Sequence, residues 1–171
     1  MGVDKATLTI DGIALGRRVA VALGVEEGRT VIACGGRQET AHVLGLAHLP
    51  DDQPGEGPLA AAATLLNAFA GQDVIAAACD LAGLDRLAVQ QFEQPGILAC
   101  YDAAVAFTGE RQPSLIRWAS ASLPIIHQMI ADGERSLHGA LERLRIFEVE
   151  VEPSSVVNLN SPHDIEVWQR S

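Results

Sequence analysis

Residues 74–84 read VIAAACDLAGL, in which six apolar residues run without a break into Asp80. A short apolar run with no polar alternation is typical of a strand that is buried on both faces, as in a parallel sheet. Asp80 then stands at the carboxyl end of that strand, where open α/β sheets bind their ligands. Its carboxylate suits Mg²⁺, which takes oxygen ligands and shares them with substrate phosphates. The alternative is that Asp80 only caps the turn into the next helix, and this stretch alone leaves both open.

The length and composition of the chain suit one folded domain over residues 1–171. Its 171 residues are 48% hydrophobic, which excludes a disordered chain. The net charge of −10 repels nucleic acid and anionic lipid, so we expect neither nucleic acid nor a membrane as a partner. A phosphorylated substrate is compatible with this charge, because Mg²⁺ can bridge the like charges.

The cysteines and the hydropathy of the chain predict a cytoplasmic protein. Cys34, Cys79 and Cys100 form no C-x-x-C pair, and they lie beside small or apolar residues, as free thiols do in a reducing cytosol. No apolar run approaches the roughly 20 residues that a membrane span needs. Asp4 and Thr7 come too early in the chain for a signal peptide.

Strands and helices are predicted to alternate along the first hundred residues, which favours a three-layer α/β domain with a mostly parallel central sheet. A polar loop is expected at 109–113, and an extended segment at 156–160 leads to a last helix capped by Ser161. The remaining strands are expected at 7–10, 30–34, 46–49, 74–79, 97–100, 103–107 and 146–151, and the helices at 14–23, 59–70, 85–92, 120–131 and 136–144.

Two stretches at the ends of the chain offer further ligands for a phosphorylated substrate. Lys5 can neutralise triphosphate charge, although a lone lysine is more often simply solvated. Asn158 and Asn160 flank Leu159, so in an extended segment their amides lie on one face. An amide oxygen there can complete a Mg²⁺ shell begun by Asp80; the alternative is a polar turn before the last helix.

The stretch DDQPGEGPL, residues 51–59, is the most loop-like part of the chain and precedes a long apolar helix. Its glycines allow the backbone to approach a ligand closely, and a helix that begins near Pro58 presents an N-terminus that attracts anions. Glu56 opposes a direct phosphate cradle. The loop is therefore expected to shape a base or substrate pocket.

Several of these stretches together resemble MobA-like nucleotidyltransferases, the molybdenum cofactor guanylyltransferases. Residues 1–5 look like the end of the signature L-A-G-G-x-S-x-R-M-G-x-D-K, and residues 51–59 resemble D-x-x-P-G-x-G-P-L. Residues 79–84 resemble C-D-x-P-x-L without its proline, and residues 158–164 resemble N-x-N-T-P-x-D. The substrate-side loops of the family are matched by residues 112–113 and 132–136. The resemblance covers essentially the whole chain and implies a Rossmann-like nucleotidyltransferase fold.

The resemblance also implies a reaction, in which a pterin-linked phosphate attacks the α-phosphate of GTP and pyrophosphate leaves. Molybdopterin would be the acceptor, and molybdoenzyme maturation proteins would be partners. The protein would act by positioning and by charge neutralisation from Lys5 and Mg²⁺. Asp51 is chosen over Asp52 as the residue in the nucleotide pocket only because of the number of residues between it and Gly57. The implied catalytic residues are Lys5 and Asp80, the Mg²⁺ ligands Asp80 and Asn160, and the nucleotide-binding residues Gly2, Lys5, Asp51, Gly57, Asn158 and Asn160.

One half of the first signature, L-A-G-G-x-S-x-R, has no counterpart in residues 1–171. In the family, that half supplies the first central strand and the glycine loop over the phosphates. We therefore expect the first strand to be missing, a gap beside residues 74–79, and an inactive chain. An upstream extension of roughly 8–20 residues is expected to restore activity. The alternatives are a transferase that uses CTP or another acceptor, and a non-catalytic relative that binds a nucleotide or a partner protein.

Overall fold

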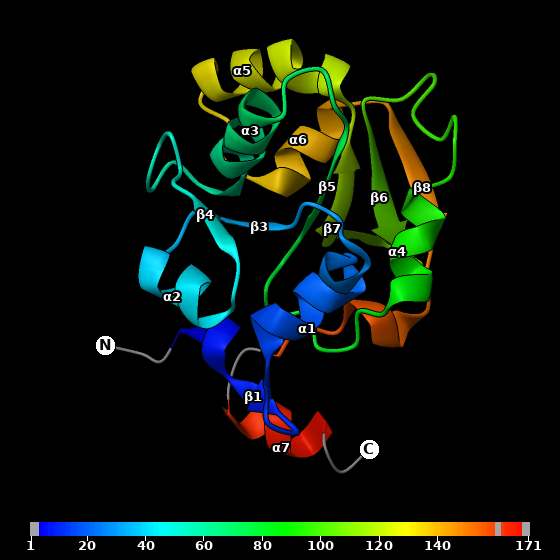
Figure 1. Ribbon diagram of the computed structural model, residues 1–171. Helices are drawn as coiled ribbons and strands as arrows, with labels where there is room; N and C mark the ends of the chain where they lie inside the picture. The colour runs from blue at the N-terminus through cyan, green and yellow to red at the C-terminus, as the bar shows by residue number, and fades with distance from the viewer. Residues whose placement is uncertain (1–3, 160–161, 169–171) are drawn as a thin grey trace.

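The fold is a mixed α/β arrangement in which a four-stranded sheet lies between two layers of helices (Figure 1). The computed structural model describes residues 4–159 and 162–168. In the sheet, whose order is β5-β7-β6-β8, β7 runs against the other three strands. The elements are η1 Lys5–Thr7, β1 Thr9–Ile10, β2 Ile13–Ala14, α1 Leu15–Ala22, η2 Val25–Glu27, β3 Ile32–Cys34, α2 Gln38–Val43, β4 Ala47–Leu49, α3 Pro58–Ala68, β5 Val74–Ala77, α4 Arg86–Phe92, β6 Ala103–Phe107, β7 Arg111–Trp118, η3 Ser120–Ser122, α5 Leu123–Ala131, α6 Leu137–Arg143, β8 Ile146–Glu150, η4 Pro153–Val156 and α7 Pro162–Trp168.

The side chains of the sheet alternate between the two helix layers, as the two-residue period of a strand requires. On one face, Ala104 and Leu115 join a core cluster with Val19 of α1 and Phe92 of α4. On the other face, α3, α5 and α6 close a second cluster that includes Ala103, Val105, Ile116 and Trp118. This arrangement confirms the predicted three-layer α/β architecture.

The loop predicted over residues 109–113 is present at Gly109 and Glu110, but residues 111–113 already belong to the strand β7, so that part of the prediction is wrong. Pro113 lies where the pairing of β6 with β7 shifts: Val105 pairs with Ile116, but the next residue, Ala106, pairs with Gln112. A proline is tolerated at such a bulge because it need not donate to the ladder there. The bulge therefore lets a strand run through a sequence that reads as a turn.

The predicted strand at residues 97–100 is also wrong, because this segment forms turns. Gly96 has a φ of 79°, in the left-handed region that favours glycine. Its carbonyl then accepts a hydrogen bond from the Ala99 N–H at 3.0 Å. The chain thus bends back before it enters β6.

The predicted strand at residues 74–79 is present as β5, but it is not central in the described part of the chain. It lies at the end of the four-stranded sheet, and all of its residues are half-buried. The parallel pair β3–β4 forms a separate sheet. A cavity of about 790 Å³ is lined by the backbones of both β3 and β5, so the predicted gap beside residues 74–79 is confirmed.

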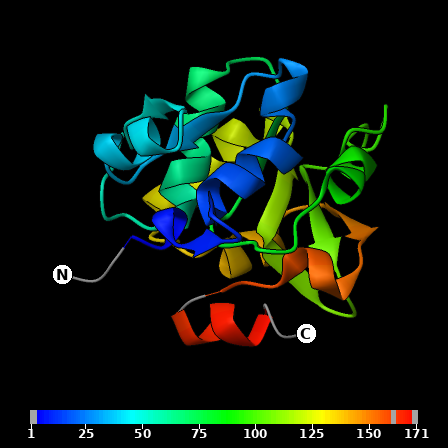
Figure 2. The same ribbon diagram turned by 60° about the horizontal axis from the view of Figure 1, so that its bottom comes forward.

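The two ends of the described chain pack together at one end of the molecule. Ile10 and Leu15 form a small apolar cluster with Ala82 and Leu159, against which Trp168 of α7 packs. Figure 2 brings this end forward and shows α7 outside the two helix layers. The loop after β5 is therefore buried beneath segments from both ends of the chain.

Two helices begin with side-chain caps, and the predicted cap Ser161 lies outside the described residues. Ser136 Oγ accepts the Gly139 N–H at 3.0 Å at the start of α6, and Asp85 Oδ1 accepts the Ala88 N–H at 2.8 Å at the start of α4. Each cap satisfies one of the N–H groups that a helix leaves unpaired at its start. Within residues 4–159 and 162–168, no helix is long and apolar enough to cross a membrane.

Candidate active site

The side chains of Lys5 and Asp80 meet where β5 ends. Lys5 Nζ lies 3.7 Å from Asp80 Oδ2, and the two side chains are 47% and 16% exposed. Lys5 begins η1, and Asp80 follows β5 after two residues, so the pair joins parts of the chain far apart in sequence. A cation and a carboxylate at the carboxyl end of a strand can together place a phosphate and a metal ion.

The loop that carries Asp80 is held in place by the segment 157–159. The Leu159 N–H donates to the Asp80 carbonyl at 3.0 Å, and the Ala82 N–H donates to the Val157 carbonyl at 3.1 Å. Between these bonds, Leu81 and Asn158 form an antiparallel bridge. The predicted proximity of Asn158 to Asp80 is thus present in the backbone, and the Asn158 side chain is exposed. Asn160 and Gly2 lie outside the described residues.

The same loop turns at Gly83, where a larger residue would not fit. A Cβ added there would lie 1.9 Å from the Ser154 carbonyl oxygen. The close approach of two backbones, together with the two hydrogen bonds to residues 157–159, fixes the direction in which the loop leaves the sheet. The proline position of the C-D-x-P-x-L motif is occupied by Ala82, which is buried beside this turn.

A further carboxylate beside this pair, Asp4, was not among the predicted site residues. Its Oδ2 accepts the Thr40 hydroxyl at 2.7 Å and lies 3.5 Å from Arg37 Nη2, while Oδ1 accepts the Ala6 N–H at 3.2 Å. The Thr40 hydroxyl is the main reason why the pKa of Asp4 lies below its usual range, and the Ala6 N–H and Arg37 add to it against the effect of burial. Asp4 ties η1 to the start of α2. Its match to the aspartate of the M-G-x-D-K motif was the signal in the sequence that could have found it.

The charges of Asp4 and Asp80 converge on Cys79. Burial raises the pKa of the Cys79 thiol, and the negative charges of Asp80 and Asp4 raise it further, while Lys5 acts in the opposite direction. Cys79 directly precedes Asp80 and Asp4 directly precedes Lys5, so the contact of Lys5 with Asp80 brings these four residues together. A neutral thiol beside the pair adds no charge that would repel a phosphate.

Asp51 and Gly57 lie in the loop between β4 and α3. Asp51 Oδ1 accepts the Gln53 N–H at 3.0 Å and the Thr64 hydroxyl at 3.3 Å, which fixes the loop against α3. A Cβ added to Gly35 would lie 3.9 Å from the Asp51 Cβ, so the ends of β3 and β4 adjoin. The loop therefore extends the candidate site past the carboxyl end of β3.

Gly57 brings this loop against the segment 132–136, which resembled a substrate-side loop. It has a φ of 87°, and a Cβ there would lie 2.8 Å from the Arg135 carbonyl oxygen. That carbonyl also accepts the Leu59 N–H at 3.3 Å. The side chain of Arg135 returns to Glu56 in an ion pair. Gly57 thus has a packing role that its motif did not reveal.

The residues near Asp80 fit a magnesium ion that is held jointly with a substrate. Within the described residues, no group of three or more His, Cys, Asp or Glu side chains is arranged to hold a metal alone. Mg²⁺ is ordinarily bound by one or two carboxylates together with substrate phosphates and water. One half-buried carboxylate beside a lysine suits that mode of binding.

Comparison with protein families agrees with this architecture. The model of the MobA-like NTP transferase domain matches residues 1–146 of the chain. The chain belongs to this family. By that membership it is a nucleotidyltransferase. A search of curated proteins finds no match.

Solved structures share the fold of this MobA-like domain. Molybdopterin-guanine dinucleotide biosynthesis protein A from Archaeoglobus fulgidus is 20% identical, with a TM-score of 0.77 over 99% of this chain and 93% of that one. 2-C-methyl-D-erythritol 4-phosphate cytidylyltransferase from Thermus thermophilus is 17% identical, with a TM-score of 0.67 over 98% and 94%. A hypothetical transferase from the same organism is also 17% identical, with a TM-score of 0.65 over 96% and 91%. At these identities the likeness concerns the fold.

Proposed function

We propose that this MobA-like domain transfers the GMP moiety of Mg-GTP to the phosphate of molybdopterin. The observation that carries the proposal is the approach of Lys5 Nζ to Asp80 Oδ2, 3.7 Å apart at the carboxyl end of β5, in a chain of this family. A terminal phosphate oxygen of the acceptor forms a bond to the α-phosphorus of GTP. The bond from that phosphorus to the bridging oxygen of the β-phosphate breaks, and its electron pair leaves with pyrophosphate.

We propose a role for each of the predicted site residues, of which Gly2 and Asn160 lie outside the described part of the chain. Lys5 neutralises phosphate oxygens, and Asp80 supplies a carboxylate to Mg²⁺, with Asn160 or Asn158 completing the shell. Mg²⁺, when bound, stabilises the negative charge that develops on the phosphates. Gly2 would approach the phosphates by its backbone. Asp51 and Gly57, in the loop between β4 and α3, shape the nucleotide pocket past the carboxyl end of β3.

The activity is tested by pyrophosphate release from Mg-GTP with molybdopterin as acceptor. We expect pyrophosphate release with GTP and little with CTP. The assay is run on residues 1–171, which are expected to be inactive, and on a chain lengthened at its amino end. Turnover with CTP alone would replace the guanylyltransferase proposal by the cytidylyltransferase alternative. Tight nucleotide binding without pyrophosphate release in either chain would support a non-catalytic relative.

The role of Lys5 has a test that does not depend on turnover, because Lys5 is the only lysine in the chain. Reductive methylation followed by peptide mapping reports the reactivity of its ε-amine, and the terminal α-amine is an internal control. With Mg-GTP at about ten times its Kd, methylation of Lys5 should slow about tenfold, since only the unbound fraction reacts. Equal methylation rates with and without Mg-GTP, at a concentration shown to saturate binding, would remove Lys5 from the nucleotide site.

A further inference from the structure

The hydrogen bond between Thr40 and Asp4 joins α2 to the segment that carries Lys5. Thr40 lies on α2, which connects the two strands of the β3–β4 sheet, and Asp4 directly precedes η1. The Thr40 hydroxyl donates to Asp4 Oδ2 at 2.7 Å, and a carboxylate acceptor makes such a bond strong. The proposed catalytic lysine is therefore tied to a helix that carries none of the proposed site residues.

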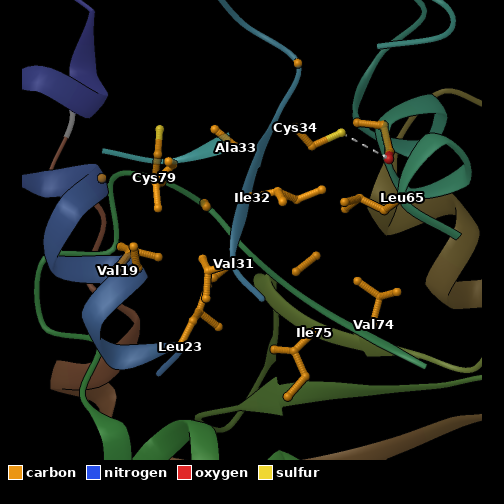
Figure 3. Close-up of a pocket in the computed structure, with 18 of the residues that line it drawn as sticks. Val19, Leu23, Val31, Ile32, Ala33, Cys34, Leu65, Val74, Ile75 and Cys79 are labelled. Atoms are coloured by element: carbon orange, nitrogen blue, oxygen red, sulfur yellow. Dashed lines mark hydrogen bonds between the residues drawn. The ribbon is translucent and has the colours of Figure 1, made fainter. Parts of the chain in front are cut away.

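Strand pairing does not set the position of α2 relative to Asp80 in the described part of the chain. There, β3 pairs only with β4, and β5 pairs only with β7. Figure 3 shows β3 and β5 on either side of a cavity, with Ile32 on one side and Val74 and Ile75 on the other. The contact of η1 with α2 thus provides a link between the β3–β4 unit and the end of β5.

Both carboxylate oxygens of Asp4 are engaged, each with a different partner. Oδ1 accepts the Ala6 N–H at 3.2 Å and so caps η1. Oδ2 accepts the Thr40 hydroxyl and lies 3.5 Å from Arg37 Nη2. One oxygen sets the direction in which η1 leaves Asp4, and the other fixes that starting point against α2. Because Lys5 is the next residue, these two contacts together determine where its backbone lies.

Apolar packing holds the middle of η1 independently of the Thr40 hydroxyl. Ala6 is buried, and a Cβ added to Gly16 of α1 would lie 3.3 Å from the Ala6 Cβ and 2.7 Å from Leu44 Cδ1. Leu44 follows Thr40 by four residues, which is the spacing of one helix face. Loss of the Thr40 hydroxyl should therefore release the start of η1, while these apolar contacts keep the segment folded.

The ion pair at Asp80 is too weak to hold Lys5 without help from the backbone. Lys5 Nζ lies 3.7 Å from Asp80 Oδ2, and the lysine side chain is 47% exposed. A lysine carries its charge on a flexible stem, and an exposed ion pair gains little energy against the entropy of that stem. A backbone that is fixed in advance limits the positions that the ammonium group can take.

We propose that Thr40 is a positioning residue, which acts through Asp4 to hold the ammonium group of Lys5 against Asp80. The role in catalysis rests on the proposed function, in which Lys5 meets the substrate phosphates. Arg37 supports the same carboxylate from the start of α2. The alternative is a purely structural tie between η1 and α2. Such a tie would affect stability and would act equally with and without Lys5.

The position of Lys5 can be measured without turnover by carbodiimide cross-linking. The reagent joins an amine to a carboxylate in contact with it as an amide, and takes up the water that is lost. Lys5 is the only lysine in the chain, so peptide mapping identifies its amide with Asp80 directly. In residues 1–171, Thr40→Val should lower the yield of this cross-link at least about tenfold.

Two matched variants control for the loss of the Thr40 hydroxyl. Thr40→Ser keeps a hydroxyl at this position and should restore the yield of the Lys5–Asp80 cross-link. Thr9→Val changes an exposed threonine of β1 in the same part of the chain and should leave the yield unchanged. Urea denaturation of each variant shows that it is folded.

A change at Asp4 separates the tie to α2 from the cap of η1. Asp4→Ser keeps one oxygen for the Ala6 N–H but has no second oxygen for Thr40. It should therefore lower the cross-link yield as much as Thr40→Val does. This variant also tests the proposal if Thr40→Val does not fold.

Binding of Mg-GTP tests whether Thr40 acts through Lys5. Thr40→Val should weaken Mg-GTP binding about tenfold in otherwise unchanged protein, and it should have no further effect when combined with Lys5→Gln. A protein that gives the expected cross-links but binds no Mg-GTP, at either chain length, would refute the proposed function and leave the positioning of Lys5 by Thr40 standing.

Three results would overturn the proposal. The first is an absent Lys5–Asp80 cross-link in the wild type, or an equal yield in the wild type and in Thr40→Val. The second is a loss in Thr40→Ser as large as that in Thr40→Val, which would assign the effect to the methyl group. The third is an equal weakening of Mg-GTP binding by Thr40→Val with and without Lys5, which would make the contact a structural tie.

Discussion

The strands β5 and β6 have similar apolar sequences, VIAA and AAVAF, but they differ in burial. Ala103 to Ala106 of β6 are fully buried, whereas every residue of β5 is half-buried. Both strands lie between helices on both faces, so hydrophobicity and face packing do not explain the difference. Within residues 4–159 and 162–168, β6 has hydrogen-bonded neighbours on both edges, and β5 has one. Burial of a central strand therefore depends on its lateral neighbours as well as on its own composition.

The largest expected effect concerns the chemistry at the end of β5. Asp80→Ala should lower turnover at least about 1000-fold, in whichever chain length is active, because it removes the proposed metal carboxylate. The control is Asp85→Ala, which removes the cap of α4 and should cost about 1 kcal/mol of stability with turnover retained. Pyrophosphate release and urea denaturation separate the two outcomes. If Asp80→Ala instead behaves like Asp85→Ala, Asp80 is a structural cap.

Much of this architecture was accessible from the sequence because apolar period and turn chemistry are local. The continuous run at residues 74–79 predicted β5, and the helices expected at residues 85–92 and 136–144 are present as α4 and α6. The strand β7 was missed because Pro113 is tolerated only through a bulge with β6, which is a long-range feature. The predicted strand at 97–100 failed because Gly96 turns the chain back first.

The candidate site was predicted in part for the same reason. Asp80 and Lys5 stood out as isolated charges in apolar or glycine-containing stretches, and the fold brings them together. Asp4 was missed because its partner, Thr40, lies 36 residues away and reveals nothing locally. Gly57 was read as a ligand-binding glycine, while its contact with the Arg135 carbonyl depends on tertiary packing.

The comparison of β5 with β6 is sharpened by one substitution made in each strand. Val105→Ala removes a fully buried side chain and should cost about 3 kcal/mol, whereas Val74→Ala on half-buried β5 should cost about 1 kcal/mol. Urea denaturation of the two variants in residues 1–171 measures the difference. Equal costs in the unextended chain would contradict the explanation by lateral neighbours.

A matched pair of aspartates precedes the same two strands and predicts a difference with pH. Asp102, before β6, accepts three hydrogen bonds from Arg145, and its side chain is 9% exposed. Asp73, before β5, pairs with Arg117 at 3.0 Å and is 32% exposed. At pH 7, Asp102→Asn should cost about 2 kcal/mol and Asp73→Asn less than about 1 kcal/mol.

The cost of Asp102→Asn should depend on pH with a definite sign. The side-chain hydrogen bonds from Arg145 are the main reason why the pKa of Asp102 lies below its ordinary value of 3.8. A carboxyl group whose pKa is lowered by folding stabilises the folded state fully at a pH above its ordinary pKa. This stabilisation is lost as the pH falls through the pKa that the group has in the folded state. The stability gap between wild type and Asp102→Asn should therefore be constant from pH 7 to about pH 5 and narrow below about pH 4. A gap that widens in acid would contradict this assignment.

The smallest effect should be seen in the thiols, where it changes a reaction rate and leaves the fold intact. Cys34, at the end of β3, donates to the Ala61 carbonyl at 3.8 Å, and burial, followed by the charges of Asp51 and Asp52, raises the pKa of its thiol to about 11. Because the thiolate is the nucleophile, well under about 1% of Cys34 is reactive at pH 8.5. Iodoacetamide should therefore modify Cys34 at least about tenfold more slowly than the exposed Cys100, as peptide mapping would show. Its rate should keep rising about tenfold per pH unit up to pH 9.5, whereas a thiol of ordinary pKa with restricted access would level off near about pH 9. If the rate at Cys34 levels off below pH 9, the pKa of its thiol is not raised. The partial burial of β3 then has no effect on the ionisation of Cys34.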